Sequence, residues 1–314
     1  MKSVLVTGGA GFIGSHLAEQ LAQKGVAVRV LDNFSSGTSN KPVLQDVGAQ
    51  IIQGDVRKID NVRDALDGID TVFHLAAQNR AGRSIENPLE NNDINVTGTL
   101  TVLEACRKHG GPKNFIFASS SSVYGGGTGK KALSEEAPRA PVHPYGVGKM
   151  ADEEYCRVYH QLYGLNTVVL RYASVYGPRQ RSDIEYAAVV PKFVDSILSN
   201  KPLTIFGDGK QTRPFTYVLY TVSATMLVAE NKKAAGQVYN VANPQSASVN
   251  QIVEILSSIS TKKPRLAREK PLPNEPKDNP IDSRKLQKLG WKPRFTFEQG
   301  LRAMVAWRKE RRNQ

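Results

Sequence analysis

The chain has 314 residues, of which 40% are hydrophobic, and it carries a net charge of +13 at pH 7. This length predicts two domains, or one large domain with an inserted lobe, and the hydrophobic content is ample for a core. No apolar stretch approaches the roughly 20 residues of a membrane-spanning helix, and the first strand lacks the flank of a signal peptide, so no membrane partner is expected. Two cysteines without a close pair, Cys106 and Cys156, fit a reducing cytoplasm, which is the predicted compartment.

The positive charge is spread along the chain, with local runs only at 130–131, 262–263 and 308–312. A nucleic-acid-binding protein would concentrate such charge in a patch, whereas ligands that carry diphosphates would reward a positive cleft. We therefore favour a basic surface with an anion-binding cleft and expect no specific nucleic acid partner, while incidental RNA or DNA affinity stays open. Scattered histidines without metal-ligand spacing predict no metal site; they are His16, His74, His109, His143 and His160.

The first thirty residues have the order of a nucleotide-binding unit. A short β-branched run at 4–6 predicts a buried strand, and a glycine-rich segment at 7–14 follows it. Residues 15–22 place apolar side chains on one face of a helix, and 26–31 predicts a second strand. This strand, glycine turn, helix and strand predict a dinucleotide site.

The residue types in this unit fit NAD. Gly8, Gly11 and Gly14 let the backbone turn tightly, approach a pyrophosphate and pack helix on strand. The helix N-terminus then faces the phosphates with free N–H groups. Asp32, about twenty residues past the loop, is placed to bind the adenosine ribose hydroxyls, and its charge would repel the 2′-phosphate of NADP.

The β/α alternation continues and predicts an α/β fold with a doubly wound parallel sheet. After Leu170 the regularity drops and turn-rich, proline-rich segments predict a smaller C-terminal lobe that closes over the cleft. The predicted division is 1–171 plus about 214–242 for the NAD-binding domain, and about 172–213 with 243–314 for the lobe. Further strands are predicted at 49–53, 71–77, 114–118 and 167–170, and helices ending near Leu66 and spanning 92–109 and 145–163.

Tyr145 and Lys149 lie four residues apart on a predicted helix, so they share a face. The ammonium favours the phenolate, which predicts a pKa for Tyr145 below its usual value near 10. A hydroxyl from the serine run 119–122 would share a hydrogen bond with the same substrate oxygen. Together these groups could move a proton on or off an alcohol, although such pairs are often only surface neighbours.

Motifs along nearly the whole chain resemble the extended short-chain dehydrogenase/reductase family, and in particular its nucleotide-sugar epimerases of the UDP-glucose/UDP-galactose type. The residues that carry the resemblance are 7–14, 32–37, 54–57, 74–78, 95–99, 119–125, 145–149, 171–179, 186–193 and 207–213. The resemblance implies a Rossmann-type fold, NAD as the cofactor and a UDP-sugar as the substrate. It also implies a homodimer in which helices 92–109 and 145–163 form a four-helix bundle; the alternative is that both helices only cover the sheet.

The resemblance assigns roles residue by residue. Tyr145 would be the acid/base, Lys149 would hold the nicotinamide ribose, and Ser120 would be the catalytic hydroxyl. The expected cofactor contacts are Gly8, Gly11, Phe12, Ile13, Gly14, Asp32, Asn33, Ser36, Gly37, Asp55, Val56, Leu75, Ala76, Ala77, Gln78, Asn95, Tyr145, Lys149 and Tyr172. The expected substrate contacts are Ser120, Tyr145, Ser174, Ala188, Val189, Arg213 and Lys277.

Two serines indicate the reaction type. The family's 4,6-dehydratases and decarboxylases carry acids where this chain has Ser121 and Ser122, which favours a 4-epimerase that works through a transient 4-keto sugar. Alternatives are another nucleotide-sugar enzyme of the family (4,6-dehydratase, reductase or uronate epimerase), or a non-catalytic NAD-binding or RNA-binding protein.

The substrate shell departs from the family pattern at several places. Lys277 stands where a second diphosphate arginine is usual and cannot form the same bidentate fork. Asn279 falls near the gate for the sugar 2-substituent and is small, so N-acetylated sugars also fit. The remaining departures are Ser174 for an asparagine, Pro214 for an aspartate, and Leu219-Tyr220 for an acid pair.

Overall fold

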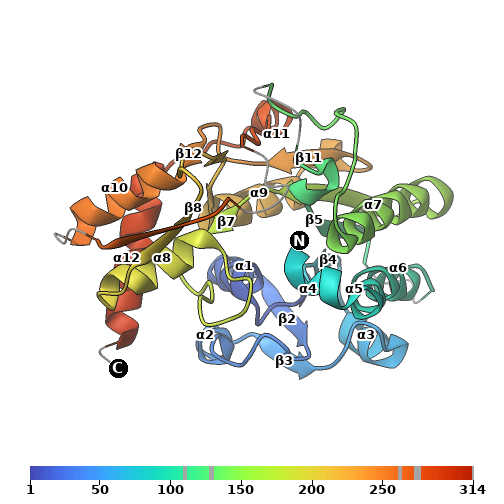
Figure 1. The fold of residues 1–314 in the computed structure, drawn as a ribbon. Helices are drawn as coiled ribbons and strands as arrows, with labels where there is room; N and C mark the ends of the chain where they lie inside the picture. The colour runs from blue at the N-terminus through green and yellow to red at the C-terminus, as the bar shows by residue number, and fades with distance from the viewer. Residues whose placement is uncertain (109–111, 127–130, 261–263, 272–276, 313–314) are drawn as a thin grey trace.

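The computed structural model describes residues 1–108, 112–126, 131–260, 264–271 and 277–312 (Figure 1). His109, Lys130, Lys262 and Lys263, which were singled out above, lie outside the described residues, as does part of the proline-rich stretch before Pro280. None of the helices in the described part of the chain is long and apolar enough to cross a membrane.

A parallel sheet of seven strands forms the centre of the molecule and confirms the predicted fold class. Its order is β11-β6-β5-β4-β1-β2-β3, so the chain starts in the middle, winds to one edge and then to the other. Every pairing in this sheet is parallel. The strands are β1 (Ser3–Thr7), β2 (Ala27–Asp32), β3 (Gln50–Gln53), β4 (Thr71–His74), β5 (Asn114–Ser120), β6 (Asn166–Tyr172) and β11 (Val238–Val241).

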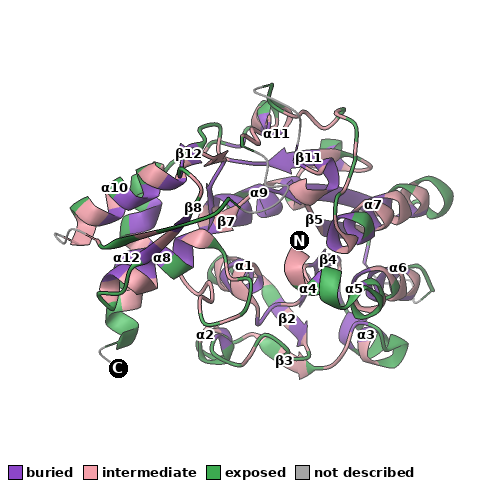
Figure 2. Cartoon of the chain, viewed as in Figure 1, coloured by how far each residue is buried: buried purple, intermediate pink, exposed green. Residues whose placement is uncertain are grey.

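Helices cover both faces of the sheet, because its central strands are apolar on both sides. In β1, Val4 and Val6 belong to one hydrophobic core and Leu5 to the other. One face carries α1 (Phe12–Gln23) and α9 (Val218–Glu230), and the other carries α3 (Ile59–Leu66), α6 (Gly98–Lys108) and α7 (Pro144–Tyr163). Figure 2 shows the buried residues on the strands and on the sides of the helices that face them.

The region before α6 differs from the continuous helix predicted over 92–109. A π-helical turn, η1 (Asp93–Thr97), joins α5 (Pro88–Asn92) to α6, and α4 (Ala81–Glu86) precedes them. Such π-turns are frequent at functional sites because the extra residue re-aims one side chain. Here the turn contains Asn95, one of the expected cofactor residues.

The C-terminal part contributes short paired strands and a second group of helices. The three pairs are β7 (Val175–Tyr176) with β10 (Thr216–Tyr217), β8 (Leu203–Phe206) with β13 (Leu266–Glu269), and β9 (Thr212–Arg213) with β12 (Ala247–Ser248). In Figure 1, α8 (Val189–Leu198), α10 (Val249–Ser260) and α12 (Phe297–Arg312) gather beside the sheet, and α11 (Arg284–Lys288) lies above β11.

Candidate active site

The glycine turn after β1 has a shape that only glycine can give it. Gly8 has a φ of +69°, and a Cβ there would lie 2.7 Å from the backbone nitrogen of Ala76. Gly14 packs against the backbone of Gly8 in the same way. Gly11 precedes α1 with no side chain to cap it, so Phe12 and Ile13 begin a helix whose N-terminus is open. This cradle fits a dinucleotide pyrophosphate.

Asp32 at the end of β2 fixes the glycine turn. Its two carboxylate oxygens accept hydrogen bonds from the backbone N–H groups of Ala10 (2.9 Å) and Phe34 (2.7 Å). Burial raises the pKa of this carboxyl, and the two N–H groups oppose the rise. Each oxygen keeps a further lone pair, which leaves room for the ribose hydroxyls that were predicted as its partners.

The loops beyond β2 and β3 carry the other residues expected near the adenosine. Gly37 has a φ of +94°, and the carbonyl of Ser36 accepts a hydrogen bond from Arg181 (2.7 Å). Asp55 forms an ion pair with Arg57 (2.6 Å), which lowers the pKa of that carboxyl to about 2. The Asn33 side chain also bonds to Asp55, and Val56 beside it is buried.

Asn95 holds the loop that follows β4. Its Oδ1 accepts from the backbone N–H of Gln78 (2.8 Å) and its Nδ2 donates to the Gln78 carbonyl (3.1 Å). Leu75 and Ala76 continue the strand direction, with the N–H of Leu75 bonded to Thr7, and Ala77 follows. The side chain of Asn95 thus shapes the backbone that was expected to face the cofactor.

Ser120, Tyr145 and Lys149 are brought together, as their motif predicts. Ser120 ends β5, and its Oγ donates to Ser122 Oγ (3.0 Å); the Ser120 hydroxyl also lies close enough to Tyr145 to lower the pKa of the phenol. Tyr145 lies in the first turn of α7, buried like Lys149 one turn later. The Lys149 ammonium donates to the carbonyl of Ala118 (2.9 Å) and lies 6.0 Å from the centroid of the Tyr145 ring.

The predicted lowering of the Tyr145 pKa is wrong for the protein alone. Burial of the phenol raises its pKa to about 12, and the nearby Ser120 hydroxyl only partly opposes this rise. Burial also lowers the pKa of Lys149, because an ammonium in an apolar site loses its hydration. The i, i+4 spacing indicated a shared helix face but not how deeply that face is buried.

The residues expected at the diphosphate come from two segments that the fold joins. The backbone N–H of Thr212 donates to the Lys277 carbonyl (2.9 Å), and the Arg213 guanidinium donates to the same oxygen (3.4 Å). Arg213 and Lys277 are therefore neighbours although 64 residues separate them. Ala188 and Val189 open α8, with Ala188 as its N-cap.

Two expected contacts have their own structural constraints. The hydroxyl of Tyr172 bonds to Thr225 on α9 (2.6 Å), and its ring packs in the core. Ser174 has a φ of +44°, in the left-handed region that asparagine tolerates better than serine. This backbone conformation explains physically why asparagine is usual at this position, which the sequence pattern alone did not reveal.

The Leu219-Tyr220 departure belongs to an aromatic cluster at the junction of the sheet with the C-terminal helices. Tyr220 is 3% exposed and packs edge-to-face on Trp291 (6.2 Å between centroids), while the first turn of α9 carries no acid. Pro214 lies between Arg213 and the cluster, and its carbonyl accepts from Thr216 (2.9 Å). The cluster comprises Tyr176, Phe215, Tyr217, Tyr220, Trp291, Phe295 and Phe297.

Sequence reasoning missed two residues that position the site. Ser84 on α4 is buried, and its Oγ accepts the backbone N–H of Tyr145 (3.2 Å), which fixes the start of α7. Arg181 ties a C-terminal segment to the Ser36 loop. Neither residue stands in a motif, and both contacts span long sequence distances, so no local signal could have found them.

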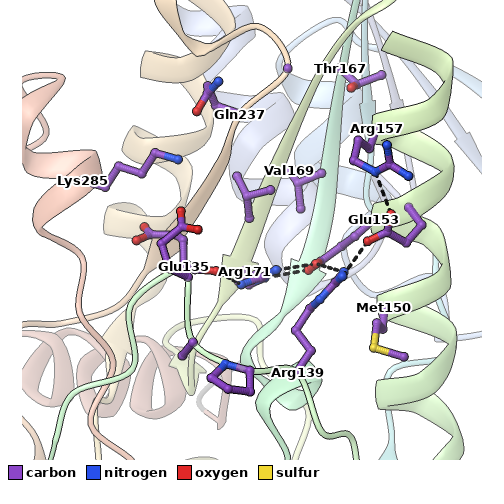
Figure 3. Close-up of a pocket in the computed structure, with 16 residues that line it drawn as sticks. Glu135, Arg139, Met150, Glu153, Arg157, Thr167, Val169, Arg171, Gln237 and Lys285 are labelled. Carbon is purple, nitrogen blue, oxygen red and sulfur yellow. Dashed lines mark hydrogen bonds and ion pairs between the residues drawn. The ribbon is translucent and has the colours of Figure 1, made fainter. Parts of the chain in front are cut away.

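A separate cavity of about 580 Å³ lies beside α7 (Figure 3). It runs between α7, β6 and the 135–139 loop, and its floor is an ion pair between Arg171 and Glu153 (2.7 Å). Glu153 also accepts from Ser119 (2.6 Å), the residue before Ser120. Its acidic and basic side chains mostly pair with one another, so the cavity wall supports α7 and gives no clear selection for a charged ligand.

Comparison with known proteins agrees with this geometry. Residues 4–242 match the model of the NAD dependent epimerase/dehydratase family. The fold is also similar to three solved structures that carry different sugars.

The first is a UDP-glucose 4-epimerase from Thermotoga maritima with UDP-glucose, at a TM-score of 0.93 and 33% identity over 98% of this chain and 99% of that one. The second is a UDP-N-acetylglucosamine 4-epimerase from Methanobrevibacter ruminantium with UDP-N-acetylmuramic acid, at 0.93 and 36% over 99% of both chains. The third is a UDP-glucuronic acid 4-epimerase from Bacillus cereus with UDP-glucuronic acid and NAD, at 0.90 and 36% over 98% of this chain and 99% of that one.

Proposed function

Since the chain belongs to the NAD dependent epimerase/dehydratase family, within the extended short-chain dehydrogenases/reductases, we propose that it is a UDP-sugar 4-epimerase of the UDP-glucose/UDP-galactose type. Its cofactor is NAD. The observation that carries the proposal is the meeting of Ser120, Tyr145 and Lys149 beside the strand ends that form the glycine cradle.

The chain's own residues would handle the proton of the sugar 4-hydroxyl. Tyr145 would take this proton, and Ser120, which lies near Tyr145, would share a hydrogen bond with the same oxygen. Lys149 supplies the positive charge that favours the phenolate. NAD, when bound, would supply the acceptor and the donor of the C4 hydride and would not be consumed. Arg213 and Lys277 would hold the diphosphate while the 4-keto sugar rotates.

Ser121 and Ser122 favour epimerisation over elimination. Both lie in η2 (Ser121–Tyr124), directly after Ser120, and Ser122 is occupied by the hydrogen bond from Ser120. Removal of water from the sugar requires a second acid/base, and neither serine can supply a carboxylate here.

The sugar itself is tested by incubating the purified protein with UDP-glucose, UDP-galactose, their N-acetylated forms and UDP-glucuronate, and separating the products by chromatography. The proposal expects interconversion at C4 of UDP-glucose and UDP-galactose with no added NAD and no net NADH. A product lighter by one water would identify a dehydratase instead, and turnover of UDP-glucuronate alone would identify a uronate epimerase. Absence of turnover on every sugar would overturn the proposal.

We further propose a homodimer through α6 and α7. Apolar side chains on the outer face and C-terminal end of α7 are exposed, among them Leu162 at 68% and Val147 at 50%. Burial of this face by a second copy would remove them from water. Light scattering coupled to size exclusion tests the mass, and Leu162→Glu is expected to give monomers. The division into an NAD-binding domain (1–171 plus about 214–242) and a sugar-binding lobe is likewise part of the proposal.

A further inference from the structure

Asp152 is a buried carboxylate on α7 to which the proposed mechanism gives no role. Its side chain is 0% exposed, and neither of its oxygens has a hydrogen-bond partner within the described part of the chain. A carboxylate without water or a hydrogen-bond donor is costly to ionise. Its charge therefore depends on the groups that surround it.

Lys149 is the nearest source of compensating charge on the same helix. It precedes Asp152 by three residues, a spacing that places two side chains on one face. The Lys149 ammonium is itself buried at 2% exposure, with the Ala118 carbonyl (2.9 Å) and the face of Phe117 (4.5 Å) around it. Among the charges near Lys149, Asp152 favours the ammonium most strongly.

A chain of buried hydrogen bonds ends at Thr99, whose hydroxyl lies near Asp152. The backbone N–H of Ala76 donates to Thr7 Oγ1 (3.3 Å), and the Thr7 hydroxyl shares a hydrogen bond with His74 Nδ1 (2.7 Å), in which we assign Thr7 as the donor. His74 is neutral, since burial lowers its pKa to about 3, and its Nε2–H then donates to Thr99 Oγ1 (3.0 Å). The Thr99 hydroxyl proton is then free to point toward Asp152. It favours the ionised carboxylate, although the two groups do not meet the geometry of a hydrogen bond.

We propose that Asp152 is a positioning residue for the proposed epimerase, the titratable counter-ion that keeps the Lys149 ammonium charged and in place at alkaline pH. The inference rests on the proposed function for its kinetic consequence only. The coupling of Asp152 to Lys149 is argued from their three-residue spacing on α7 and the burial of both side chains, and it would connect the loop that begins at Ala76 to the catalytic lysine.

The other titratable groups around Lys149 do not act as its counter-ion. Glu153 is held by Arg171 (2.7 Å) and Ser119 (2.6 Å), and burial raises the pKa of Cys156 well above its usual value, so this thiol stays neutral. Tyr145 keeps its proton to a pKa of about 12 in the protein alone.

Asp152 is the group whose charge changes near neutral pH. Burial raises its pKa to about 8, and the Lys149 charge opposes that rise. Below this value Asp152 is neutral, and above it the carboxylate favours the protonated lysine.

The kinetic test compares Asp152→Asn with the native enzyme across pH. At pH 6.5 the native carboxyl is neutral, so kcat of the two proteins is expected to agree within about twofold. Above pH 8 the variant loses the counter-ion, and its alkaline limb is expected to move down by about one pH unit with KM unchanged. Glu154→Gln, which removes an exposed carboxylate two residues along α7, is the matched control and leaves the profile unchanged. A kcat lowered equally at every pH would overturn the proposal.

A stability test needs no substrate. Thermal unfolding of the native protein, Asp152→Asn, Lys149→Met and the double variant is followed at pH 9 and pH 6.5. At pH 9 the change of Asp152 is expected to lower the Tm when Lys149 is present. In the Lys149→Met background the carboxylate is unpaired, so the same change is expected to raise the Tm. At pH 6.5 the two shifts are expected to agree.

The two tests separate the two proposals. Equal Tm shifts in both backgrounds at pH 9 would show that Asp152 and Lys149 are not coupled and would overturn the inference, whatever the sugar. Coupling without turnover on any UDP-sugar would overturn the proposed function and leave the pairing standing. If Asp152→Asn does not fold, Thr99→Val, which removes the donor at the end of the chain, replaces it in the same cycle and is expected to couple to Lys149 in the same direction.

Discussion

The proposed cofactor side and the proposed substrate side of the site are built in different ways. On the cofactor side, side chains are tied to the backbone of nearby loops: Asp32 accepts two N–H groups, and Asn95 pairs with both backbone groups of Gln78. On the substrate side, Arg213 at the end of β9 meets Lys277, which lies next to an isolated bridge between Thr212 and Asp278. A side chain that holds a nearby loop can be replaced by few other residue types, whereas contacts between distant segments tolerate more substitutions. The departures from the family pattern accordingly lie on the substrate side.

Removal of the acid/base should have the largest effect, because both sides of the cleft serve it. Tyr145→Phe deletes the phenolic hydroxyl near Ser120, the proposed acid/base, and is expected to lower kcat by about 10²–10⁴-fold with little change in KM. Tyr159→Phe, on the same helix and bonded to Glu104, is the matched control. Steady-state kinetics on the UDP-sugar that the protein turns over would measure both; equal kcat for Tyr145→Phe and the native protein would favour a vestigial site.

The residues of the cofactor side could be predicted from the sequence better than those of the substrate side. The glycine turn, Asp32 and the Tyr145–Lys149 pair were predicted from the residues because each belongs to a recognisable motif, whereas Ser120 was singled out of the run 119–122 only through the family resemblance. The pKa of Tyr145 was mistaken in direction, since burial depends on how α7 packs on the sheet, which the i, i+4 spacing does not contain.

The proximity of Arg213 to Lys277 could be predicted only through the family resemblance. Their contact depends on an isolated pairing of Thr212 with Asp278, for which the chain carries no local signal. The cluster around Tyr220 was missed for the same reason.

His16 connects α1 to the segment around Pro178, and it should make the stability of the protein sensitive to acid. It lies on α1, and its Nε2 donates to the Pro178 carbonyl (3.0 Å). Burial, assisted by Arg179, lowers its pKa to about 4 from the usual 6.5. The native protein therefore holds His16 neutral while the unfolded chain takes up a proton, so this contribution is complete above pH 6.5 and is lost as the pH falls toward 4.

Each pH unit in that window should cost about 1.4 kcal/mol through His16. Urea unfolding of the native protein and of His16→Gln, repeated between pH 6.5 and 4.5, isolates this residue because every other group is shared. The native protein is expected to lose the extra stability and the variant is not. Parallel pH dependence of the two proteins would show that His16 is not held neutral.

Charge at the diphosphate should affect binding more than chemistry. Arg213→Ala is expected to raise KM by roughly tenfold or more with kcat nearly unchanged, since a charge-assisted hydrogen bond is worth about 1.5–3 kcal/mol. Lys277→Arg is expected to lower KM, because a guanidinium can grip a phosphate with two N–H groups. Arg213→Lys keeps the positive charge but loses the two-pronged guanidinium, so its KM should lie between those of the native protein and Arg213→Ala. A fall in kcat without a change in KM would place Arg213 outside the binding role.

The smallest expected effect tests the strain that the substrate side carries. Ser174 has a φ of +44°, and Asn200, at a φ of +55°, shows the residue type that suits such a conformation. Ser174→Asn is expected to stabilise the protein by about 0.5–1 kcal/mol, because an L-residue pays roughly 1–2 kcal/mol in the left-handed region and asparagine pays less.

Asn200→Ser is the matched reverse and should cost a similar amount, and thermal unfolding measures both as opposite shifts of a few degrees at most. If Ser174→Asn stabilises the protein and leaves KM unchanged, serine at this position is tolerated strain. If KM rises while stability improves, the serine hydroxyl contacts the substrate and the departure from the family pattern is functional.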